Sequence, residues 1–236
     1  MLKTKVVSLF FKFAKALILK KLLLLSFILS SLFHFLHAQE PGTPGNPIID
    51  SNMSEREAFD GLHPDCPAEI RKRQRVVALK YYSFDGKVHR GQLVVDKDLV
   101  KDIKKIFRLG LRIRFPIHSI IPISHPDFRK NGRWDDDLSM AANNTSAFNY
   151  RLKVGGGSLS KHAYGHAIDI NCIQNPYIKG TTVLPPGSSY QPEIPGTLTA
   201  DHPITRKFIE LGWEWGGSWT SLKDYQHFEK AVGGKK

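Results

Sequence analysis

Two runs of β-branched and aromatic residues, 76–83 and 87–95, flank the dipeptide Asp85-Gly86. Because an Asp-Gly pair tolerates the positive φ of a tight turn, this arrangement predicts a β-hairpin. Strands that pair directly through a short turn are antiparallel. The hairpin therefore restricts the first part of the fold to an antiparallel sheet.

The segments after the hairpin predict helices and short strands in an α+β order. Apolar residues at helical spacing predict a helix over residues 98–109, and alternating apolar and basic residues predict a strand over 111–115. A further strand is expected over 167–171, and a last helix begins after Asp201 and ends at Gly212. This order is not the βαβα alternation of a parallel sheet, so we expect a small antiparallel sheet with flanking helices.

Two long stretches hold few periodic apolar positions. Residues 124–161 are rich in Asn, Asp, Gly and Ser, and residues 175–199 are rich in Pro, Gly and Ser. We expect irregular structure in both. Long loops in compact domains are usually functional or disordered.

The first 38 residues are typical of a secretory signal peptide. Residues 1–21 are basic and apolar without an acidic residue, residues 22–36 are almost wholly apolar, and Ala38 is a small residue at which a signal peptidase can cut. The apolar stretch is shorter than the ~20 residues that a membrane span needs. An uncleaved anchor that extends into residues 6–21 is the alternative. In either case we expect an exported protein, periplasmic or extracellular, with a membrane tether in the second case.

The composition behind this leader indicates one folded domain. Residues 39–53 are rich in Pro, Gly and Asn, which predicts a linker, and a single domain is expected over residues 54–236. Export permits a disulfide between Cys66 and Cys172, and two unpaired buried thiols are the alternative. We expect a monomer.

The net charge favours anionic surfaces without indicating nucleic acid. The formal charge is +12, and six of the 34 Lys and Arg residues precede Ala38, which leaves +6 for the remaining chain. This excess suits attraction to cell-wall polymers or lipid headgroups. Since no basic stripe is interleaved with aromatic residues, we expect no nucleic-acid partner.

The metal-ligating residue types are concentrated in residues 158–171 and 224–229. These segments supply His162, Asp169 and His227, two imidazoles and one carboxylate, which are suitable donors for zinc. Three protein ligands leave a fourth position for water, as in catalytic rather than structural zinc sites. An unpaired carboxylate at Asp169 would be costly in an apolar strand, and a metal ion would provide its partner.

Two motifs in this order resemble those of the LAS-type zinc peptidases of bacterial cell walls. That family includes VanY-like D-alanyl-D-alanine carboxypeptidases and L-alanyl-D-glutamate endolysins. The first pattern, S-x-H-x-x-G-x-A-x-D, is met by Ser160, His162, Gly165, Ala167 and Asp169. The second, an acidic residue three positions before a histidine that an aromatic residue follows, is met by Asp224, His227 and Phe228. The resemblance covers residues 85–230 and implies the fold that hedgehog domains share with D-Ala-D-Ala peptidases.

The resemblance also implies a zinc metallopeptidase and assigns roles to its residues. The two histidines and Asp169 would hold zinc, and Asp224 would act as the general base that accepts a proton from the attacking water. Arg151 resembles the family's arginine that polarises the scissile carbonyl, although only ten residues separate it from His162, fewer than in endolysin-like members. Ser160 would contact a metal ligand or the substrate.

The implied substrate is a peptidoglycan stem peptide. The aspartate at position 224 and the segment from Trp219 that leads to it resemble the endolysin type. This resemblance favours cleavage between L-alanine and D-glutamate. D-alanyl-D-alanine carboxypeptidase activity is the alternative, because Arg151 or Lys161 could hold a terminal carboxylate. A second alternative is a hedgehog-like zinc domain that binds without hydrolysing. Asp224 argues against it, because a domain that only binds needs no carboxylate beside its metal.

Overall fold

The computed structural model describes residues 17–30 and 40–232, and the chain divides into two compact units, residues 1–46 and 47–236. In the first unit residues 17–30 are helical. Among the described residues, no helix combines the length and the apolar character that a membrane span requires. The expected cleavage site at Ala38 and much of the expected signal peptide lie outside the described residues.

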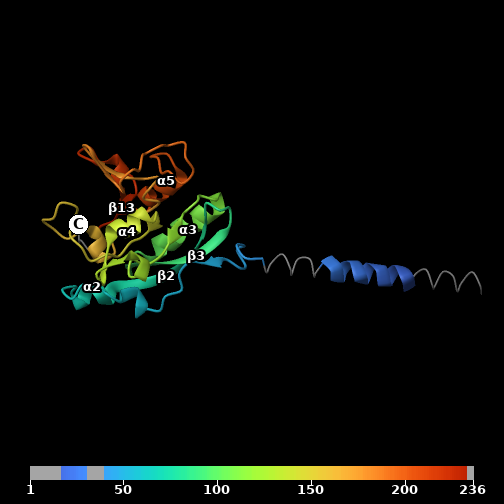
Figure 1. The fold of residues 1–236 in the computed structure, drawn as a ribbon. Coiled ribbons are helices and arrows are strands. Elements are labelled where there is room, and N and C mark those ends of the chain that lie inside the picture. The colour runs from blue at the N-terminus through green and yellow to red at the C-terminus, as the bar shows by residue number, and fades with distance from the viewer. Residues whose placement is uncertain (1–16, 31–39, 233–236) are drawn as a thin grey trace, which may run out of the picture. The chain divides into compact units, whose positions relative to one another are not determined.

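The second unit combines helices (α), short 3-10 helices (η) and strands (β), which confirms the expected α+β class (Figure 1). In chain order its elements are β1 (Ile48–Ile49), η1 (Glu57–Phe59), α2 (Ala68–Arg73), β2 (Gln74–Tyr82), β3 (Val88–Asp96), α3 (Val100–Ile113), β4 (Ser119–Ile120), η2 (Pro126–Phe128), β5 (Arg129–Lys130), β6 (Arg133–Trp134), α4 (Asp136–Ala141), β7 (Asn144–Thr145), η3 (Lys161–Tyr164), β8 (Ala167–Asp169), β9 (Tyr177–Lys179), β10 (Thr182–Leu184), α5 (Pro203–Glu210), β11 (Glu214–Trp215), η4 (Gly216–Ser218), β12 (Lys223–Asp224) and β13 (His227–Glu229).

The second unit starts earlier than the sequence predicts. β1 pairs in parallel with β3, and the Ser51 hydroxyl donates a hydrogen bond of 2.7 Å to the buried Gln92 side chain. The amide of Met53 donates to the same Gln92 oxygen at 2.6 Å. Residues 48–53 are therefore tied to the hairpin, whereas the sequence analysis placed them in a linker over 39–53.

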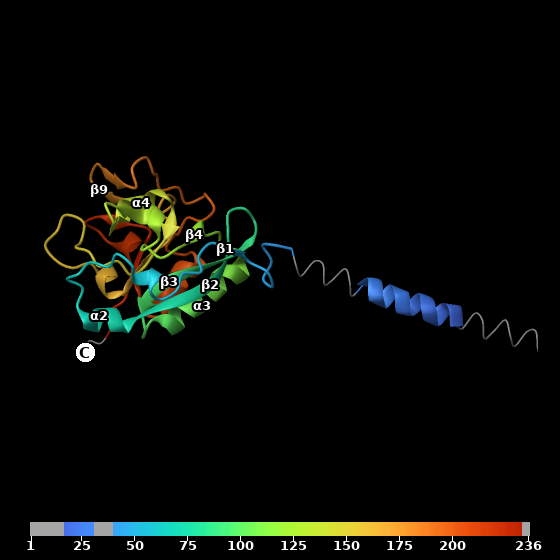
Figure 2. The same cartoon turned by 60° about the horizontal axis from the view of Figure 1, so that its bottom comes forward.

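The expected hairpin is present, as β2 and β3 pair antiparallel along nine residues each. α3 lies along this hairpin, on the side of the unit away from α4 and β9 (Figure 2). The main hydrophobic core is formed by residues of the hairpin, α3, α5, β8 and β13. In it, the rings of Phe208 and Phe228 stack with their centroids 3.8 Å apart.

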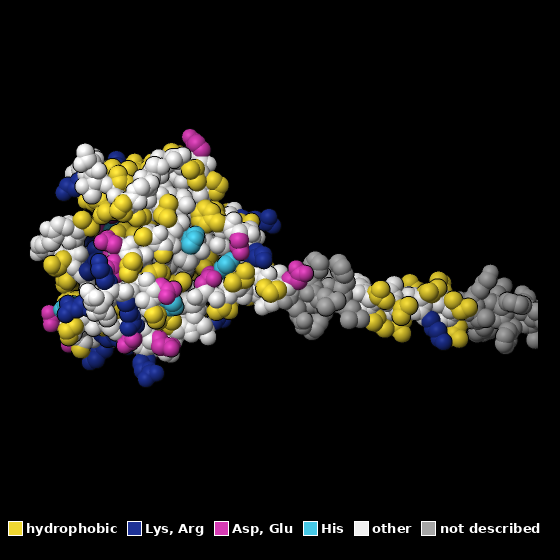
Figure 3. Space-filling view, viewed as in Figure 1, with side chains coloured by type: hydrophobic (Ala, Val, Ile, Leu, Met, Phe, Trp, Pro, Cys, Tyr) yellow, Lys and Arg dark blue, Asp and Glu magenta, His cyan; other side chains and the backbone are white. Residues whose placement is uncertain are grey.

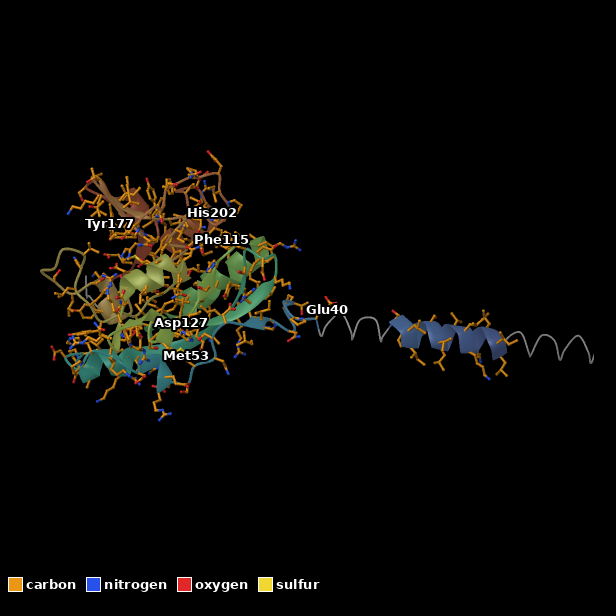
Figure 4. All side chains as sticks on the ribbon, in the orientation of Figure 1. Glu40, Met53, Phe115, Asp127, Tyr177 and His202 are labelled. Atoms are coloured by element: carbon orange, nitrogen blue, oxygen red, sulfur yellow. The ribbon has the colours of Figure 1, made fainter. Side chains whose placement is uncertain are left out.

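The helix expected over 98–109 runs on to Ile113, so the strand predicted over 111–115 is wrong. Gly110 does not end α3. It is buried where α3 meets α5, and a Cβ there would lie 3.5 Å from Ile204 Cδ1. The chain leaves the helix at Arg114, which adopts the left-handed conformation at φ 55°. Phe115 then packs on His202 at the start of α5, with ring centroids 4.7 Å apart (Figure 4).

The expected strand over 167–171 and the expected last helix correspond to β8 and α5. The stretches expected to be irregular hold short elements as well. α4 begins after Asp135, whose carboxylate accepts a hydrogen bond of 3.0 Å from the Leu138 amide. β9 and β10 form a hairpin within the Pro/Gly-rich stretch, and β12 pairs with the other edge of β9.

Basic and acidic side chains are interspersed on the face of the second unit in Figure 3.

Cys66 is half-buried, Cys172 is buried, and both are free thiols. Of the two alternatives for these residues, the structure has the unpaired one.

An ion pair between a partly exposed arginine and a buried aspartate links α2 to the end of β3. Two nitrogens of Arg73 lie 2.6 and 2.8 Å from the two carboxylate oxygens of Asp96, whose side chain is only 1% exposed. Burial raises the pKa of Asp96, but hydrogen bonds from Arg73 and the Asp98 amide outweigh it and hold the pKa below its ordinary value. The pair thus stabilises the fold when Asp96 is ionised.

Arg73→Met should lower the free energy of unfolding by about 1–3 kcal/mol at pH 7, since it leaves a buried carboxylate short of partners. Because the folded-state pKa of Asp96 is depressed, the pair contributes above the unfolded-state pKa of about 4 and is lost as the pH falls below it. Urea unfolding at pH 7 and pH 3 should therefore give a smaller difference from wild type at pH 3. Lys72→Met, at an exposed position in the same helix, is the control. An equal deficit at both pH values would contradict this assignment.

Candidate metal centre

Strand pairing brings together two of the three predicted ligands. In the antiparallel pair of β8 and β13, Asp169 stands directly opposite His227. The third, His162, lies in η3, close before β8. Asp169 Oδ1 is 2.9 Å from His227 Nδ1, Asp169 Oδ2 is 3.1 Å from His162 Nε2, and the two ring nitrogens are 3.2 Å apart. All three residues are buried, and together they could hold a metal ion.

Two further motif residues shape the turn that carries His162. Ser160 is the residue before η3, and its hydroxyl accepts a hydrogen bond of 3.2 Å from the His162 amide. Gly165 ends η3 with φ +68°, and a Cβ there would lie 2.1 Å from Gln74 Oε1. The Asp96 amide donates to the Gly165 carbonyl at 3.1 Å. Only glycine fits here, so the motif's serine and glycine have a structural reason.

Each histidine is oriented by an acceptor on its other ring nitrogen. His162 Nδ1 lies 2.6 Å from the Ala147 carbonyl oxygen, and His227 Nε2 lies 3.1 Å from Glu229 Oε2. If each ring donates through that nitrogen, the facing nitrogens of both rings present lone pairs to Asp169. Lone pairs and a carboxylate repel one another unless a cation lies among them. This donor set therefore fits a divalent metal.

The electrostatics keep Asp169 ionised. Burial raises the pKa of its carboxyl, but when the facing nitrogens of His162 and His227 carry protons, their charges and hydrogen bonds outweigh burial and hold the pKa well below its ordinary value. An ionised carboxylate is the form that ligates metal.

Asp224 presents a carboxylate to the same cavity. Its Oδ1 is buried and has no hydrogen-bond partner. Gly216 lets β12, which carries Asp224, pass close to the backbone of η4, because a Cβ at Gly216 would lie 2.5 Å from the Asp224 carbonyl oxygen. Burial raises the pKa of Asp224 to about 6, against the opposing charge of His227. A buried carboxylate oxygen without a partner is an acceptor left available for a ligand or water.

A cavity of about 300 Å³ joins all the residues that the sequence predicted for the site. It is lined by the three candidate ligands and by Ser160, Arg151, Lys161 and Asp224. Trp219 also lines it, with its ring centroid 5.4 Å from that of His227. The structure thus brings the predicted residues together in one cavity, although a loop separates Arg151 from His162 in the chain.

Sequence reasoning missed the two acidic residues Asp136 and Glu229 of this cavity. Asp136 pairs with Arg151 at 2.8 Å and also accepts a hydrogen bond of 2.9 Å from Asn149. In the sequence, Asp136 stands out only as part of the acidic run 135–137, which forms the start of α4. Glu229 was signalled by period-two spacing, since residues two apart on a strand share a face. Phe228, between His227 and Glu229 in the chain, is part of the hydrophobic core.

Comparison with known proteins agrees with this geometry. Residues 154–230 match a family model described as D-alanyl-D-alanine carboxypeptidase. This range includes the three candidate ligands and Asp224. The match confirms the resemblance seen in the motifs. Together with the clustered ligands, it indicates a metallopeptidase. Comparisons with curated proteins and with solved structures gave no significant match.

Glu229→Ala should weaken Zn²⁺ binding by about 10–100-fold, because the His227 ring loses the acceptor that fixes its orientation. Competition with a chromophoric chelator measures the affinity. Glu229→Gln keeps an acceptor oxygen and should retain most of the binding. Glu214→Ala is the matched control, because Glu214 is exposed and stands opposite Glu229 in the pairing of β11 with β13. Wild-type affinity in Glu229→Ala would show that this contact does not support the metal.

Proposed function

We propose that this domain is a zinc-dependent peptidase that hydrolyses peptidoglycan stem peptides. One observation carries the proposal: the buried cluster of His162, Asp169 and His227 lines a cavity that also holds the carboxylate of Asp224, whose Oδ1 has no hydrogen-bond partner. The family match supports the same function, because it is described by an activity on the D-alanyl-D-alanine end of these peptides. The donor set and the open cavity are those of a catalytic rather than a structural zinc site.

The residues around the cluster divide the chemistry among them. Zinc held by the three ligands would supply a Lewis acid and lower the pKa of a coordinated water towards ~7. Asp224 can accept the proton of the attacking water on its free oxygen and return it to the leaving amine. Arg151 is held at the cavity wall by Asp136, and its guanidinium can donate to the carbonyl oxygen as negative charge develops there.

For the bond, we favour cleavage between L-alanine and D-glutamate. Aspartate rather than glutamate at position 224 supports this choice. The description of the matched family favours the alternative, a D-alanyl-D-alanine carboxypeptidase. The two substrates share chemistry beside the scissile bond, because in each the leaving residue is a D-amino acid with a free α-carboxylate. Lys161 lines the cavity and can attract that carboxylate in either case.

A hedgehog-like domain that binds zinc without hydrolysis is the remaining alternative. The position of Asp224 argues against it, since a buried carboxylate oxygen without a hydrogen bond is costly and serves no purpose in a domain that only binds. We further propose that the protein acts outside the cytoplasm as a monomer, after export directed by residues 1–38. It is then either released or tethered through that segment.

Asp224→Asn should keep the zinc and lose most of the hydrolysis, about 10²–10⁴-fold in kcat, because the amide cannot accept the proton. Zinc content by elemental analysis and turnover of purified muropeptides measure the two effects. His162→Ala is the comparison that should lose both metal and activity. Loss of zinc from Asp224→Asn would make Asp224 a structural residue, and full activity would point to another base.

Digestion of a stem pentapeptide should release L-alanine from the N-terminal side, as detected by mass spectrometry. The expectation follows from the endolysin-like aspartate. Release of D-alanine alone from the other end would overturn the choice of bond, while the zinc peptidase would stand. The same digest with Asp224→Asn protein is the control for contaminating peptidases.

A further inference from the structure

A second cavity, of about 550 Å³, adjoins the metal cavity. The two share Asp136 and Arg151 in their linings, so the ion pair between these side chains forms a common wall. The second cavity therefore lies directly beside the metal cavity, within reach of a long substrate. Its volume lies in the range of about 300–1,000 Å³ that is typical of small-molecule sites.

The second cavity is lined by apolar and aromatic side chains and by a similar number of polar and charged ones. Trp134 and Tyr150 supply aromatic rings, and Leu152 and Leu159 supply aliphatic surface. Its polar lining includes Arg133, and the further polar residues His63, Asp65 and Asn149 also line it. Such a mixture suits a ligand with an apolar face and a polar edge.

The aromatic residues are held by the protein core. Trp134 Nε1 donates a hydrogen bond of 2.7 Å to the Asp60 carbonyl, and its ring meets Phe148 edge-on at 5.9 Å. Tyr150 packs with Trp134 against the second hydrophobic cluster, which includes Phe59 and Phe148. The rings are thus positioned before any ligand arrives, which reduces the ordering cost of binding.

We propose that this cavity binds the muramyl sugar to which the stem peptide is attached. The inference rests on the proposed function, in its L-alanyl-D-glutamate form. In that substrate the sugar's lactyl group is joined directly to L-alanine, so the sugar is the next group on the N-terminal side of the scissile residue. The apolar C–H face of a pyranose ring packs on aromatic rings, while its hydroxyl and acetamido groups can pair with the polar lining.

Binding of two probes to the full-length Asp224→Asn protein, loaded with zinc, tests the proposal by calorimetry. N-acetylmuramyl-L-alanyl-D-glutamate should bind at least tenfold more tightly than N-acetyl-L-alanyl-D-glutamate. Adding Tyr150→Ala should abolish this difference and leave the affinity for the sugar-free probe unchanged. Arg133→Ala, at an exposed position that should not affect folding, should reduce the difference several-fold. Phe84→Ala, an exposed aromatic outside both cavities, is the matched control.

The remaining outcomes separate this inference from the proposed function. Equal affinity for both probes overturns the sugar site and leaves the peptidase standing. A sugar-free pentapeptide can be compared with N-acetyl-L-alanyl-D-glutamate. If it binds more tightly and Tyr150→Ala removes the gain, the cavity holds peptide and the sugar assignment is wrong. A sugar preference that survives both Tyr150→Ala and Arg133→Ala places the sugar elsewhere. If neither probe binds, both the sugar site and its parent function fail.

Discussion

The pairing of β8 with β13 is the interaction on which the site depends. Its register sets Asp169 opposite His227, and a shift of either strand by one residue would turn that strand's ligand away from the cavity. The register is held by the core, because Phe228 lies between His227 and Glu229 and stacks on Phe208 of α5. The hydrophobic core thus determines which polar groups face the metal position.

The hairpin supports the other half of the site from a distance. Arg73 holds Asp96, and the amide of Asp96 donates to the carbonyl of Gly165, at the end of the turn that carries His162. Gln74, at the start of β2, donates to the Tyr164 carbonyl at 3.0 Å in the same turn. A peptidase site formed by two strands and one turn is in this way braced by residues far away in sequence. Bracing of this kind keeps ligand atoms in place without a metal having to impose the geometry.

The charged residues around the cavity form a network with separate tasks. Asp169 and Glu229 both face His227, but from opposite ring nitrogens, so one can ligate while the other orients. Asp136 neutralises Arg151 at the wall between the two cavities. Among the described carboxylates that line the metal cavity, that of Asp224 presents a buried oxygen without a hydrogen bond. A buried carboxylate is tolerated when function uses it, which is why this residue supports a hydrolytic reading of the site.

The sequence by itself determined the hairpin and the α+β class and pointed to the candidate ligands, because turn chemistry, apolar periodicity and a motif such as S-x-H-x-x-G act over short distances. It misjudged Gly110, which lies inside α3 beside α5, and it missed the strand pairing of residues 48–49. Only the tertiary structure decided that Asp136 meets Arg151, that Glu229 orients His227, and that a second cavity adjoins the first. These contacts join segments or faces whose meeting depends on core packing, which local patterns do not encode.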